Sequence, residues 1–103
     1  MKVYNKLVRD RITFIMSAEG KKFKAHHATE EEYEEKLKEK LLEEVNEFIE
    51  NPCIEELADI FEVFSAIVDM MGYPQEDLIE CMNAKAEEKG AFENKIILES
   101  VEE

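Results

Sequence analysis

The sequence contains few of the residues that interrupt helices. Only three Gly and two Pro occur among its 103 residues, and few segments show the alternation of apolar and polar residues that is typical of half-buried strands. Apolar residues make up 45% of the chain, which is enough for a folded core. We therefore expect an all-α protein whose length suits a single domain, residues 1–103.

Features of membrane and exported proteins are also lacking. No stretch approaches the roughly 20 apolar residues of a transmembrane helix, and the first residues lack the apolar core of a signal peptide. Cys53 and Cys81 stand alone, without CxxC spacing, which suits a reducing compartment. We expect a cytoplasmic protein with no membrane partner. Because no G-x-x-x-x-G-K-S/T segment is present, a P-loop enzyme is excluded.

The charge is strongly acidic and unevenly distributed. The formal net charge is −13, yet residues 1–24 carry a balance of +5 and the remainder a balance of −18. Such an acidic body repels nucleic acid polymers, which bind through Lys and Arg, so we expect no polymer partner. A small polyphosphate can bind if divalent cations and the basic N-terminal residues, Lys6 and Arg9 above all, screen the acids. The alternative is that the acids serve only solubility.

Capping and helix-breaking residues divide the chain into helices. Thr29 with Glu32 forms a capping-box pattern, and Pro52 disfavours helical geometry in Asn51. Gly72 suits the residue that follows a helix. The expected helices cover approximately residues 9–19, 30–50, 54–71 and 74–89.

Two carboxylate motifs flank the turn at residues 51–52, EEVNE at 43–47 and ELAD at 56–59. In an antiparallel hairpin, residues at equal height have position numbers with a constant sum. Glu47 then lies opposite Glu56, and Glu44 lies opposite Asp59. The two motifs are therefore expected to form two facing rungs near the closed end of the hairpin.

Helical angles show where these side chains point. At about 100° per residue, Glu44 and Glu56 lie within the apolar arcs of their helices, Glu47 and Asp59 lie at the edges, and Glu43 lies on the polar side. Four close carboxylates repel one another unless a cation intervenes, and oxygen ligands suit Mg²⁺ or Mn²⁺. We expect a divalent-metal site. The alternative is an acidic surface at the border of the core.

Further candidate residues lie outside the two carboxylate motifs. Lys85 and Lys89 lie one turn apart, where they reach a bound phosphate or only complement the negative end of the helix. His26 and His27 are expected to be solvated loop residues. The apolar residues expected to pack at the end of the chain are Phe92, Ile96, Ile97 and Leu98.

The helix over residues 54–71 predicts an oligomer. Its apolar arc is about 200° wide, roughly twice what a surface helix needs. The other helices of one chain leave part of that arc uncovered. A second chain would complete a four-helix core, and we expect a homodimer or homotetramer.

Four segments resemble the MazG-like, all-α nucleoside-triphosphate pyrophosphatase superfamily, and most closely its small phosphoribosyl-ATP pyrophosphohydrolase-like proteins. They are YNKLVRDRI at 4–12, EEVNE at 43–47, ELAD at 56–59 and KAEEKGAF at 85–92. The segments occur in order over nearly the whole chain, which makes the resemblance more specific than one acidic motif.

The resemblance implies a Mg²⁺-dependent enzyme, with Mn²⁺ as a substitute, that cleaves a nucleotide between its α- and β-phosphates to release pyrophosphate. The residues that match the metal ligands of the superfamily are Glu44, Glu47, Glu56 and Asp59. Catalytic roles fall to Glu43, Glu44 and Glu47, and Glu43 is suited to orienting water. Substrate contacts are expected from Lys6, Arg9, Lys85 and Lys89.

Two departures from the superfamily pattern concern the substrate site. Only eight residues separate Glu47 from Glu56, and Lys89-Gly90-Ala91 replaces a basic residue followed by two glycines. Phosphoribosyl-ATP is an alternative substrate, and a catalytically silent acidic interaction module is an alternative function. A ferritin-like di-iron site is disfavoured because Glu-x-x-His pairs are absent.

Overall fold

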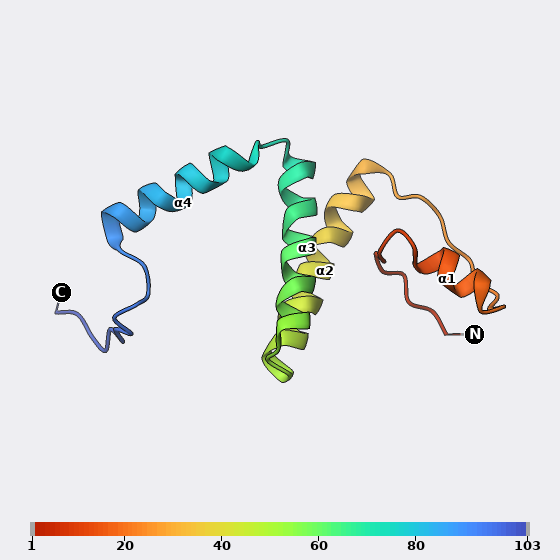
Figure 1. Ribbon diagram of the computed structural model, residues 1–103, viewed down its shortest axis with the longest axis horizontal. Helices are drawn as coiled ribbons and strands as arrows, with labels where there is room; N and C mark the ends of the chain where they lie inside the picture. Colours follow the sequence, from red (N-terminus) through yellow and green to blue (C-terminus); the bar gives the residue numbers. More distant parts are fainter. Residues whose placement is uncertain (1, 103) are drawn as a thin grey trace. The chain divides into compact units, whose positions relative to one another are not determined.

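A computed structural model describes residues 2–102, and these residues form helices and no strand (Figure 1). The helices are α1 (Ile12–Ala18), α2 (Glu30–Glu50), α3 (Ile54–Met71) and α4 (Gln75–Lys89). The expected all-α fold is confirmed. α1 is shorter at both ends than the sequence predicts. No helix in the described part of the chain combines the length and apolarity needed to cross a membrane.

Local capping chemistry sets the start of α2. The Thr29 hydroxyl accepts a hydrogen bond from the backbone N–H of Glu32 at 3.2 Å, so the predicted N-cap is present. Acidic side chains occupy the first turn, where they complement the positive end of the helix dipole. At the other end, the N–H of Asn51 donates to the Glu47 carbonyl at 3.0 Å, and the helix stops before Pro52.

Gly72 ends α3 in the left-handed conformation, with φ of 78°. Any residue with a Cβ atom is strained there, which explains glycine at this position. The sequence predicts a helix that begins at about Pro74. In the structure Pro74 is the N-cap, and α4 begins one residue later, at Gln75. Gly90 follows the last residue of α4, so the helix ends where the expected helix over residues 74–89 ends.

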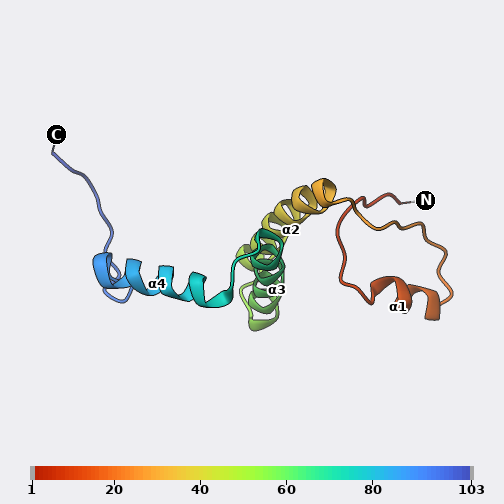
Figure 2. The same cartoon turned by 90° about the horizontal axis from the view of Figure 1, so that it is seen from above.

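The described residues divide into two compact units, and the boundary along the chain lies between Gly72 and Tyr73. In the first unit, α2 and α3 pack against each other as an antiparallel hairpin, seen from two directions in Figures 1 and 2. Leu37 of α2 and Val63 and Val68 of α3 are buried between them. This hairpin brings the two acidic motifs together.

Much of the apolar surface of α3 faces solvent. Ile54, Phe61 and Met71 are 77%, 70% and 57% exposed, although α2 covers the opposite side. The wide apolar arc is therefore present and only partly covered within the chain. The expected packing of the terminal apolar residues is wrong for a single chain, because Phe92 is 97% exposed and its apolar neighbours in the tail are also exposed. α4 likewise has no buried residue.

Candidate metal centre

Four carboxylates converge on the hairpin, two from each helix. Glu44 and Glu47 of α2 and Glu56 and Asp59 of α3 each offer one oxygen, and these four atoms all lie within 4.8 Å of one another. We call this group the acid cluster. The two motifs therefore converge, because the cluster members of each motif lie three residues apart and share one helix face.

Two oxygens of the acid cluster are buried without a partner. Glu44 is only 6% exposed, and its Oε2 atom has no hydrogen bond within the described residues. The Oε2 atom of Glu56 is likewise buried without a hydrogen-bond partner among these residues. A buried polar atom without a partner is destabilising, and the cost is larger for a charged group. Both orphaned oxygens belong to a cluster whose other members are also acids, and this is an arrangement that could hold a cation.

The dimensions of the acid cluster fit a divalent ion. Mg²⁺ binds six oxygens at about 2.1 Å, so opposite ligands lie about 4.2 Å apart. The four oxygens here lie within 4.8 Å of one another, which is close to that spacing. Carboxylate oxygens suit Mg²⁺ or Mn²⁺ better than softer metals. The residues therefore fit the metal that the sequence predicts.

Lys40 is a member of this site that the sequence analysis missed. Its ammonium group lies 3.3 Å from Oε2 of Glu43 and 3.4 Å from Oε1 of Glu44, and its side chain is only 16% exposed. The spacing of three and four residues along α2 is the signal that could have revealed it. Lys40 thus pairs with Oε1 of Glu44, whereas Oε2 is the oxygen without a partner.

Burial sets the protonation chemistry of Glu44. Desolvation raises the pKa of Glu44 above its usual range, and the adjacent Glu47 carboxylate raises it further. Lys40 opposes both effects. The repulsion between Glu44 and Glu47 is an electrostatic cost that a divalent cation would remove.

Two basic residues near the N-terminus pair with acids of the hairpin. Lys6 lies 3.0 Å from Oε1 of Glu43, and Arg9 lies 2.7 Å from Oδ1 of Asp59. The hydrogen bond between Lys6 and Glu43 raises the pKa of the lysine and lowers that of the carboxyl group. Two of the four predicted substrate ligands therefore pair with acids here: Arg9 with a member of the acid cluster, and Lys6 with Glu43, the residue before Glu44.

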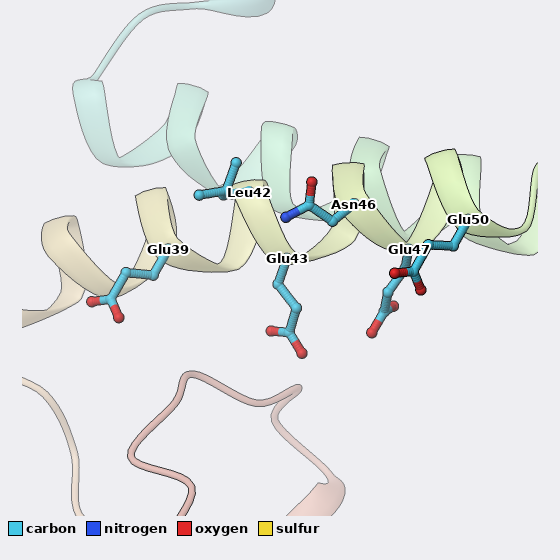
Figure 3. A pocket seen from close by; sticks show the side chains of 6 residues that line it. All are labelled: Glu39, Leu42, Glu43, Asn46, Glu47 and Glu50. Carbon is cyan, nitrogen blue, oxygen red and sulfur yellow. The ribbon is translucent and has the colours of Figure 1, made fainter.

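Glu43 points away from the interior of the hairpin, as predicted. It lines an open hollow of about 520 Å³ along α2 (Figure 3). Glu47 lines this hollow and is also a member of the acid cluster. The complete lining is Glu39, Leu42, Glu43, Asn46, Glu47 and Glu50.

The remaining candidates lie outside the acid cluster. Lys85 and Lys89 are exposed on α4, in the second unit, and their phosphate contacts stay a prediction. His26 lies 3.0 Å from Oε1 of Glu32 and is a largely exposed loop residue, in agreement with its assignment. No family model, curated protein or solved structure matches the chain.

Proposed function

We propose that this protein is a Mg²⁺-dependent nucleotide pyrophosphohydrolase that cleaves between the α- and β-phosphates, giving a nucleoside monophosphate and pyrophosphate. The main support is the acid cluster, in which two buried oxygens, one of Glu44 and one of Glu56, have no partner in the described structure. Further support comes from the resemblance of the four sequence segments to MazG-like enzymes. Phosphoribosyl-ATP is the alternative substrate.

Different residues would hold the metal ion and orient the attacking water. Glu44, Glu47, Glu56 and Asp59 would hold Mg²⁺ or Mn²⁺. When bound, such an ion draws charge from phosphate oxygens and lowers the pKa of water at the site. Glu43 lines the same hollow as Glu47, and its carboxylate can orient a water molecule by accepting a hydrogen bond.

The cations supply the substrate contacts. Lys6 and Arg9 are next to the acid cluster, and their charges can stabilise phosphates once a metal ion is present. Lys85 and Lys89 are the corresponding candidates on α4. Guanidinium groups bind phosphate through two parallel hydrogen bonds. Arg9 is therefore the best phosphate ligand among the four candidate cations.

We also propose a homodimer or homotetramer, because α3 exposes large apolar side chains such as Phe61 and a second hairpin would cover them. The same exposed face favours the second candidate function, an acidic helical interaction module without catalysis. A cytoplasmic location is part of the proposal, since Cys53 and Cys81 are free thiols.

A nucleotide panel separates these functions. Canonical, deoxy and modified nucleoside triphosphates and phosphoribosyl-ATP would be incubated with Mg²⁺ or Mn²⁺, and pyrophosphate release would be measured. We expect turnover of at least one compound and its loss in Glu47→Gln and Asp59→Asn. Glu55→Gln, an exposed neighbour of the cluster, is the matched control and should stay active. Absence of turnover across the panel would favour the interaction module.

A further inference from the structure

Three charged side chains connect the N-terminal segment, residues 2–11, to the hairpin. The ammonium group of Lys36 on α2 donates a hydrogen bond to the backbone carbonyl of Asn5 at 2.8 Å. Lys6 pairs with Glu43 of α2, and Arg9 pairs with Asp59 of α3. The segment has no helix or strand of its own. These contacts place the basic side chains of the segment beside acids of the hairpin.

One of the three contacts uses a member of the acid cluster. Asp59 offers an oxygen to the cluster and also accepts the hydrogen bond from Arg9. Among the described residues, no Lys, Arg or His nitrogen lies within 4.0 Å of the carboxylates of Glu47 and Glu56. Among the described residues, two cations thus pair with carboxylates of the acid cluster. Lys40 belongs to the hairpin itself, and Arg9 comes from outside it.

A divalent ion and the Arg9 guanidinium would compete for Asp59. Two positive groups on one carboxylate repel each other, and the repulsion doubles when one of them carries two charges. The Arg9–Asp59 pair has little to set against this, because its side chains are 56% and 37% exposed. Exposed pairs are among the weakest interactions in proteins. The ion should therefore prevail.

We propose that a divalent ion bound by the acid cluster releases Arg9 from Asp59, and that the released guanidinium then binds phosphate oxygens of the substrate. This inference rests on the proposed metal site and adds a coupling to it. Metal loading frees the phosphate-binding cation, so the site prefers a polyphosphate only after the metal has bound. Arg9 acts as an internal counter-ion in one state and as a substrate ligand in the other.

The first test follows the Arg9 side chain directly. The Nε–Hε signals of Arg9 and Arg11 would be assigned by NMR in ¹⁵N-labelled protein and followed during a Mg²⁺ titration without nucleotide. The Arg9 signal should move to its position in chelator-treated Asp59→Asn protein, where the ion pair is absent. Arg11 has no ion pair in the structure and should move little. An unchanged Arg9 signal in protein that binds Mg²⁺ would overturn the inference.

The second test uses binding affinities with opposite expected signs. By calorimetry, Arg9→Gln should bind Mg²⁺ about two- to five-fold more tightly, because an exposed ion pair no longer has to break. With saturating Mg²⁺, the same variant should bind inorganic pyrophosphate about ten-fold more weakly, since a charged hydrogen bond is lost. Arg11→Gln removes the same charge two residues away and should change both affinities much less.

Each other outcome has a defined meaning. Equal tightening of Mg²⁺ binding in Arg9→Gln and Arg11→Gln would indicate a general charge effect and refute the competition. Weaker Mg²⁺ binding in Arg9→Gln would mean that Arg9 orients Asp59, which also refutes it. If the wild-type protein binds no Mg²⁺ or Mn²⁺, the metal site of the proposed function fails together with this inference. If metal binds but Arg9 does not respond, only the inference fails.

Discussion

Replacing Glu44 with Gln should change protein stability in opposite directions with and without metal. Glu44 is 6% exposed, and its Oε2 atom has no partner among the residues described. An amide of the same shape removes the repulsion with Glu47 and can donate a hydrogen bond to that carboxylate. Lys40 keeps its contact with Glu43 at 3.3 Å. In a chelator, Glu44→Gln should therefore be more stable than the wild type.

The size of both effects can be estimated. An unsatisfied buried polar group costs about 1–3 kcal/mol, so the variant should gain about 1–2 kcal/mol, or a rise in Tm of roughly 4–15 °C for a domain of this size. Metal at 100 times its Kd stabilises a protein that binds it only when folded by about 2.7 kcal/mol. The wild type should show this gain and the variant very little of it. The order of stability should then invert.

Thermal unfolding followed by circular dichroism, at one fixed protein concentration, measures both arms. Wild type, Glu44→Gln and the exposed control Glu62→Gln would be compared in chelator and in Mg²⁺. The control should follow the wild type in both conditions. A variant that is less stable than the wild type in chelator would refute the argument from repulsion. Equal stabilisation of all three proteins by Mg²⁺ would remove Glu44 from the metal site.

Three further predictions concern neighbouring features. Lys40→Met should destabilise the protein in chelator by about 1–3 kcal/mol, because a buried carboxylate loses its cation; denaturant titration beside Lys38→Met, whose lysine is largely exposed, checks this. The raised pKa of Glu44 means that this group destabilises the fold above that pKa and ceases to do so as the pH falls through it toward the ordinary value of 4.5. The advantage of Glu44→Gln in chelator should shrink over that window, and an advantage independent of pH would contradict the assignment. Light scattering should give a mass of two or four times the 12.1 kDa of one chain, and Phe61→Glu should reduce it, whereas a folded wild-type monomer would rule out the proposed oligomer.

The sequence was sufficient to predict the hairpin and the acid cluster. Both follow from local rules, since helix periodicity orients Glu44 and Glu56 and the short turn fixes which residues face each other. Thr29 and Gly72 marked helix ends for equally local reasons, a side-chain cap and a left-handed backbone.

The contacts of the N-terminal segment could not be predicted in the same way. Lys6 and Arg9 reach partners 37 and 50 residues away along the chain, from a segment without helical or strand periodicity. No spacing rule links such residues. Their charge indicated a phosphate role, but it did not indicate which acids they pair with. The exposed tail has a different cause, because apolar residues such as Phe92 indicate burial without specifying the surface that covers them.

The central claim is that Glu44, Glu47, Glu56 and Asp59 form one divalent-metal site. Titration of the wild type with Mn²⁺, followed by calorimetry and by electron paramagnetic resonance of the free ion, tests it most directly. We predict saturable binding that is about ten-fold or more weaker in each single variant, Glu44→Gln, Glu47→Gln, Glu56→Gln and Asp59→Asn, and unchanged in Glu55→Gln. Absence of saturable binding by the wild type, or equal affinity in all five variants, would contradict the claim.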